Sequence, residues 1–141
     1  MNDTVFGFAN MLALAGWVAL LASFRFPVWA ERIAGVVVPV ILSVGYVGLI
    51  LAFWTRAPGG FGSLPEVMAL FTLPEIALAG WLHYLAFDLF VGAWEVRTAR
   101  REGIAFPLVV PCLALTFLFG PAGFLLFSAL RLARRPAEVR P

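Results

Sequence analysis

The sequence has little charge and few of the side chains that form metal sites or disulfides. Its 141 residues include one cysteine and one histidine, and only 13% of them are charged. A single cysteine, Cys112, excludes an internal disulfide and a cysteine-based zinc site. A single histidine, His83, excludes a bis-histidine haem site within one chain, whereas a homo-oligomer supplies one histidine from each copy. We therefore expect no metal ion and no cofactor.

Hydrophobic residues take the place of the missing charge. They make up 62% of the chain, and the mean hydropathy is +0.97. In a soluble domain about half of the residues are apolar and about a quarter are charged. Long apolar runs separated by short charged loops therefore predict an all-α membrane protein in contact with lipid. The ten basic residues are all arginines that gather at the ends of these runs. They are typical of interfacial anchors, and we expect no nucleic acid partner.

Four apolar runs predict a four-transmembrane-helix bundle that forms a single domain over residues 1–141. A short helix at about residues 65–71 is too short to cross a bilayer, so we expect it to be interfacial or re-entrant between the second and third spans. The four spans lie at about residues 5–24, 33–54, 74–94 and 104–130, and a basic tail follows at residues 131–141.

Local motifs refine these boundaries. Residues 63–66 (Ser-Leu-Pro-Glu) and 72–75 (Thr-Leu-Pro-Glu) both match the capping box that begins a helix. Pro39 predicts a kink in the second span. The run Phe-Gly-Pro-Ala-Gly at residues 119–123 predicts a broken helix in the fourth span, and backbone groups freed there need partners.

The arginines do not settle which side of the membrane each loop occupies. Four spans place both termini on one side, and five arginines then lie on each side. The positive-inside rule thus gives a tie. The first residues lack the basic segment of a signal peptide, so we expect an integral protein of a bacterial cytoplasmic membrane.

Two ionisable residues, His83 and Asp88, lie about halfway along the third apolar run. An ionisable group at this depth costs roughly 2.5–3.5 kcal/mol on insertion scales. On a helix the two side chains point about 140° apart, so each faces a different neighbour or both flank one cleft. Tyr84, Asp88 and Glu95 fall within about 40° of one another. We expect Glu95 to belong to the solvated end of this span.

These residues suit acid–base chemistry on an apolar substrate that enters from lipid. Ser43, Tyr46 and Thr116 are expected at a similar depth, between the two ionisable groups. A low dielectric disfavours the charged forms, and a neutral carboxyl beside a neutral imidazole is a general acid beside a base. Three alternatives remain open: a structural hydrogen-bonded network, a proton relay, or a haem or metal ligand across a dimer.

Two blocks carry a resemblance to a known family. Residues 81–90, Trp-Leu-His-Tyr-Leu-Ala-Phe-Asp-Leu-Phe, resemble the W-x-H-x-x-x-x-D-L-F signature of the neoxanthin-synthase-like family, the small membrane proteins of the plant abscisic-acid-deficient type. Residues 111–123 resemble the family's second block, C-L-…-F-x-P-x-G. An arginine that often follows the first block in this family is replaced here by Ala93 and Trp94.

The resemblance implies a four-span protein of xanthophyll metabolism. In plants the family is associated with the conversion of violaxanthin to neoxanthin, an epoxide-to-allene isomerisation. By residue-wise transfer the resemblance makes His83 and Asp88 the catalytic candidates for a carotenoid or isoprenoid substrate. The residues that would shape a slot for the polyene are Trp81, Tyr84, Phe119 and Gly120. The aromatic content and the broken fourth span also fit a different class, a non-catalytic pigment- or lipid-binding assembly protein.

Overall fold

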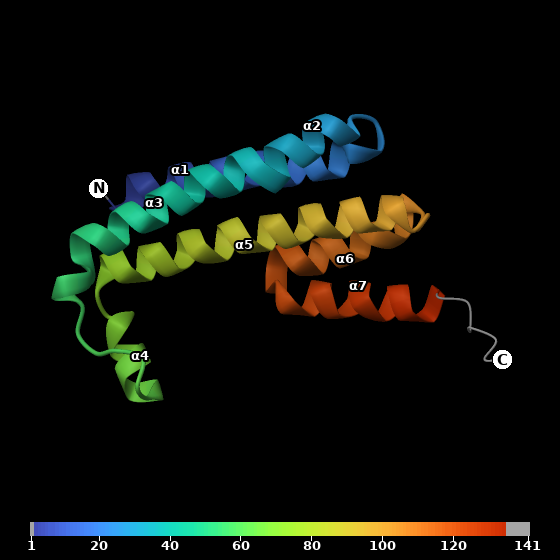
Figure 1. The fold of residues 1–141 in the computed structure, drawn as a ribbon. Coiled ribbons are helices and arrows are strands. Elements are labelled where there is room, and N and C mark those ends of the chain that lie inside the picture. The colour runs from blue at the N-terminus through green and yellow to red at the C-terminus, as the bar shows by residue number, and fades with distance from the viewer. Residues whose placement is uncertain (1, 135–141) are drawn as a thin grey trace.

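The computed structural model describes residues 2–134, and these residues are helical apart from short turns and one longer link, as Figure 1 shows. The expected tail at 131–141 is helical as far as Arg134, and its remainder lies outside the described residues. The helices are α1 (Asn2–Leu21), α2 (Pro27–Arg32), α3 (Val38–Phe53), α4 (Leu64–Leu70), α5 (Pro74–Arg101), α6 (Phe106–Phe119) and α7 (Pro121–Arg134).

Three helical segments are long and apolar enough to cross a membrane. They are Asn2–Phe24, Pro27–Arg56 and Pro74–Arg101. These segments contain the first three predicted spans and extend each of them by several residues. The all-helical class is confirmed among residues 2–134, and three of its helical segments are candidates for crossing a membrane.

Helix α5 lies at the centre of the molecule and contacts α1, α3 and α6 (Figure 1). Small residues let the helices approach closely. A Cβ atom at Gly92 of α5 would lie 2.8 Å from the Trp17 ring of α1, and one at Gly45 of α3 would lie 2.9 Å from Leu82 of α5. Lipid gives no hydrophobic drive for helix association, so this close packing supplies the attraction instead.

The second span contains an irregular turn. A π-helical turn, Ile33–Val37, joins α2 to α3, and Pro39 follows within the first turn of α3. Proline lacks the N–H that would continue the regular hydrogen-bond pattern, and π turns are one of the known ways in which a helix accommodates such an irregularity. The helix irregularity in this span, expected as a kink at Pro39, is thus a π-helical turn just before that residue.

One of the two predicted capping boxes is confirmed. Ser63 Oγ accepts a hydrogen bond from the Glu66 N–H at 3.4 Å, and α4 begins there. The second prediction, at Thr72, is wrong: its hydroxyl donates to the Ala69 carbonyl at 2.7 Å, and Leu73 precedes α5 without a side-chain cap. Thr72 instead closes the end of α4.

The predicted fourth span at residues 104–130 is replaced by a helical hairpin. The chain turns at Gly120, and α7 folds back along α6, with which it is in extensive contact (Figure 1). Each helix has 14 residues. A 14-residue helix is about 21 Å long, whereas the hydrocarbon core is about 30 Å thick, so neither helix crosses it alone.

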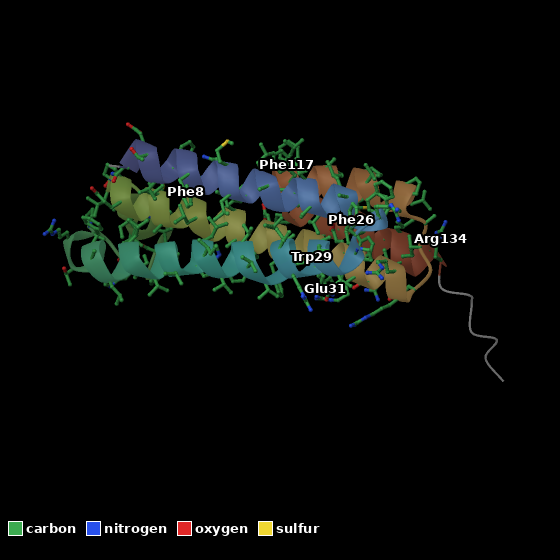
Figure 2. The ribbon with its side chains drawn as sticks, turned by 90° about the horizontal axis from the view of Figure 1, so that it is seen from above. Phe8, Phe26, Trp29, Glu31, Phe117 and Arg134 are labelled. Atoms are coloured by element: carbon green, nitrogen blue, oxygen red, sulfur yellow. The ribbon has the colours of Figure 1, made fainter. Side chains whose placement is uncertain are left out.

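Because α7 folds back, all but one of the described arginines lie at the same end of the molecule. Arg56 lies at the other end, beside α4. Figure 2 shows the arginine-rich end at Trp29, Glu31 and Arg134, opposite Phe8. Two ion pairs join its elements, Arg97 with Glu31 and Arg131 with Glu102. The arginines at this end are Arg25, Arg32, Arg97, Arg100, Arg101, Arg131 and Arg134.

We predict that the arginine-rich end faces the cytoplasm, because seven arginines against one is decisive under the positive-inside rule. The test uses single cysteines in a Cys112→Ala background and a membrane-impermeant maleimide. Ser63→Cys should react in intact cells, whereas Arg100→Cys should react only after the cells are permeabilised. The reverse pattern would contradict the predicted orientation, and labelling of both positions in intact cells would contradict three crossings.

Candidate functional site

The polar face of α5 packs against the tip of the hairpin. Tyr84 contacts the α6 side of this tip. Its hydroxyl donates to the Phe117 and Leu118 carbonyl oxygens, each at 3.1 Å. These carbonyls belong to the last turn of α6, where no further helical N–H follows to bond them. Because lipid offers no donor, an α5 side chain supplies one. Figure 2 shows Phe117 near the middle of the long axis of the molecule.

Asp88 lies one turn further along α5 and contacts the turn between α6 and α7. Gly120 forms this turn with a φ of +35°, and a Cβ there would lie 2.5 Å from Asp88 Oδ1. Tyr84 lies one turn before Asp88 on the same face of α5, so its hydroxyl and the Asp88 carboxyl meet the same hairpin tip. Asp88 Oδ2 is buried and has no hydrogen-bond partner in the described part of the chain. The positive end of the α7 dipole, which begins at Pro121, favours a carboxylate here.

Glu95 is the residue that the sequence analysis misplaced. We expected it at the solvated end of α5, but its side chain is fully buried between α5 and α6. Thr116 donates a hydrogen bond to Glu95 Oε1 at 2.9 Å, while Oε2 is buried without a partner among residues 2–134. The signal was present, because Glu95 shares the helical face of Tyr84 and Asp88. The hairpin covers this whole face, which the sequence did not reveal.

His83 lies on a different face of α5 from Asp88, as helical geometry predicted. Its ring stacks on Phe87, with centroids 4.7 Å apart, and lies 5.7 Å from the Tyr46 ring of α3. Together with α4 and the end of α3, His83 and Tyr46 line a cavity of about 270 Å³. This cavity contains neither Asp88 nor the hairpin tip. The structure therefore shows no hydrogen bond between His83 and Asp88.

Trp81 joins the tip region to α1. Its indole N–H donates to the Asn10 side-chain oxygen at 3.1 Å, and its ring stacks on Tyr84 with centroids 5.1 Å apart. Phe6 packs on the other side of the indole at 5.7 Å. Trp81 thus holds the Tyr84 ring in place, while more than a third of its own surface stays open to lipid.

The remaining predicted site residues are distributed over three places. Phe119 and Gly120 lie at the hairpin tip beside Asp88, and Phe119 is exposed. Ser43 lines a separate hollow of about 310 Å³ between α3 and Phe87. Thr116 is fully buried and bonded to Glu95, so it does not reach the surface that holds His83.

The described residues contain no group of three or more His, Cys, Asp or Glu side chains close enough to hold a metal ion. Cys112 is buried, and its thiol is 3.6 Å from the Leu108 carbonyl oxygen of its own helix. The ionisable groups that the structure places against the hairpin are Tyr84, Asp88 and, deeper in the hairpin, Glu95.

Comparison with known proteins gives one match. The family model described as ABA DEFICIENT 4-like matches residues 4–127, which include α5, α6 and the first half of α7. No curated protein and no solved structure matches the chain.

We predict that Gly120→Ala destabilises the protein, whereas Gly48→Ala does not. An alanine at position 120 combines a left-handed backbone with a collision at Asp88, a strain of about 1–3 kcal/mol. A Cβ at Gly48 of α3 meets no atom within 4 Å, and alanine favours helix there. Thermal unfolding in detergent measures both variants. Equal melting temperatures for the two would show that the tip is not packed as described.

Proposed function

Because this chain belongs to the ABA DEFICIENT 4-like family, we propose that it is a membrane-embedded isomerase of the neoxanthin-synthase type, acting on a carotenoid or related isoprenoid. The observation that carries the proposal is the Asp88 carboxyl. It lies within a membrane-spanning helix, half-buried at the hairpin tip, with Oδ2 unpartnered. A carboxyl that only braced the tip would gain by bonding both oxygens.

The substrate is expected to reach Asp88 from lipid. The hairpin tip ends about halfway along the molecule, and Phe119 and Trp81, on either side of the Asp88 region, are both exposed to the surroundings of the protein. An apolar polyene lying against these aromatic surfaces would pass from the bilayer to Asp88 without crossing water. Trp81, Tyr84, Phe119 and Gly120 are the residues that we assign to this slot.

The proposed reaction is an acid–base rearrangement of an epoxide. A proton from the Asp88 carboxyl adds to the epoxide oxygen, the C–O bond breaks, and the oxygen becomes a hydroxyl. A base removes a proton from carbon, and the electron pair of that C–H bond forms the new double bond of the allene. One proton enters and one leaves, so the product is an isomer and no redox partner is needed.

Tyr84 and His83 have different parts in this proposal. Tyr84, one turn before Asp88 on α5, holds this part of the helix against the hairpin tip through the Phe117 and Leu118 carbonyls. His83 lies on the adjoining face, beside Tyr46, in a cavity that does not contain Asp88, and we assign it as a contact for another part of an elongated substrate that crosses α5. Ser43 lies beyond Phe87 and would contact only the far end of such a molecule.

We predict that Asp88→Asn abolishes product formation, because an amide cannot donate the proton. Loss of a positioned general acid lowers a rate by roughly 10²–10⁴-fold. The measurement is co-expression with epoxy-carotenoid biosynthesis in a bacterial host, followed by chromatography of the pigments. His83→Gln should lower the yield as well.

Asp3→Asn is the matched control, since it makes the same chemical change on an exposed residue at the far end of α1. Wild-type yield from Asp88→Asn, at normal protein level, would contradict the assignment. An unchanged pigment profile for the wild-type protein across epoxy- and hydroxy-carotenoids would contradict the isomerase itself.

The second candidate function is a non-catalytic pigment- or lipid-binding protein. It is favoured by the apolar hollow of about 280 Å³ between α1 and α6, which Trp17, Leu113 and Phe117 help to line. The purified protein would then carry a stoichiometric coloured or lipid ligand. Binding that survives Asp88→Asn, without any product from the wild-type protein, distinguishes this function from the isomerase.

A further inference from the structure

Three carboxyl groups form a row along α5. Asp88, Glu95 and Glu102 are seven residues apart, so they lie on one face of the helix at intervals of roughly 10 Å along its axis. Asp88 lies at the hairpin tip, and Glu102 lies at the arginine-rich end, where its carboxylate bonds Arg131 at 2.8 and 3.0 Å. The row therefore runs from the middle of the molecule to the end that we predict to face the cytoplasm.

The central member of the row is the most deeply buried. Glu95 has no exposed surface, and only one of its oxygens has a partner, the Thr116 hydroxyl. Replacing this glutamate with glutamine would keep an acceptor for Thr116, so the hydrogen bond by itself does not require an acid. A buried ionisable side chain with an unpartnered oxygen is expensive in a membrane and is typical of proton-carrying positions.

The hairpin spans the interval between the two inner carboxyls. Thr116 bonds Glu95, and Gly120, one turn further along α6, contacts Asp88. The last turn of α6 thus connects the two positions, with the Thr116 hydroxyl at one end and the carbonyls that Tyr84 bonds at the other. Carboxyls two turns apart do not touch, so transfer between them needs intervening water molecules.

We propose that Asp88, Glu95 and Glu102 form a route by which protons pass between the aqueous phase at the arginine-rich end and Asp88. A proton taken up from water at the Glu102 end protonates Glu95. It then passes through water to the Asp88 carboxylate, which leaves Glu95 to be protonated again from the same end. The inference rests on Asp88 acting as the acid of the proposed function, because that acid must regain its proton after each turnover.

The experiment follows the Asp88 proton directly and needs no substrate. Purified protein in lipid nanodiscs is transferred from H₂O to D₂O, and infrared spectroscopy records the exchange of the protonated carboxyl band that is lost in Asp88→Asn. Glu95→Gln keeps the acceptor for Thr116 but carries no proton. It should slow exchange of the Asp88 band by roughly 10²-fold, the effect of removing a positioned proton donor.

Two variants separate proton transfer from a structural role. Thr116→Val removes the hydrogen bond to Glu95 but keeps the carboxyl, and it should leave the exchange rate near that of the wild type. Glu31→Gln changes a carboxyl outside the row, one that pairs with Arg97, and should also have no effect. If Glu95→Gln does not assemble, Glu102→Gln at the exposed end of the row replaces it, and slower exchange than in Glu31→Gln is then expected.

Three results would overturn the proposed route. They are wild-type exchange in a folded Glu95→Gln protein, equal slowing in Thr116→Val, and the absence of any Asp88-dependent carboxyl band at acidic and at neutral pH. Because the measurement involves no carotenoid, failure of the proton route can be distinguished from failure of the isomerase reaction.

Discussion

The hydrogen-bonding requirement of the backbone in lipid governs this structure. A helix that turns back within the hydrocarbon region exposes carbonyl oxygens at the end of one helix and N–H groups at the start of the next, and lipid offers partners for neither. Here the exposed groups lie around Gly120, between α6 and α7. Tyr84 satisfies carbonyls on the α6 side, and Asp88 lies against the turn. The hairpin therefore depends on Tyr84 and Asp88 of α5, and it in turn covers these two side chains.

The same arrangement links structure to chemistry. Tyr84, which completes backbone hydrogen bonds of the tip, is itself a proton-carrying group, and the Asp88 carboxyl lies one turn further along α5. Tyr84 bonds the backbone carbonyls, while Asp88 Oδ2 has no partner in the described part of the chain. A purely structural carboxyl would be expected to satisfy both oxygens. Glu95 repeats the pattern deeper in the hairpin, with one oxygen bonded by Thr116 and the other unpartnered. At the tip, backbone carbonyls without helical partners thus lie close to a carboxyl group, that of Asp88.

Folding back of the last apolar run also changes how the protein relates to the membrane. A fourth crossing would divide the arginines evenly between the two sides. With a hairpin, Arg131 and Arg134 return to the end that already carries Arg25 and Arg97, and the ion pair between Arg131 and Glu102 closes the base of the hairpin. The charge asymmetry and the row of carboxyls along α5 therefore have one origin, because both require α6 and α7 to lie beside the second half of α5.

The sequence by itself determined the helical membrane class, three of the spans, the first capping box and the family resemblance. Each of these depends on local features, namely apolar run length, a cap at Ser63 and a motif of adjacent residues. It also predicted that His83 and Asp88 point apart, because the direction of a side chain on a helix follows from residue number alone. Only the tertiary structure decided that the run at 104–130 is a hairpin, because its total length also fits a single span. The burial of Glu95 follows from that decision. Composition placed Glu95 among solvated charges near the end of α5, whereas the returning hairpin covers it, and no local pattern states which face of a helix a distant segment will cover.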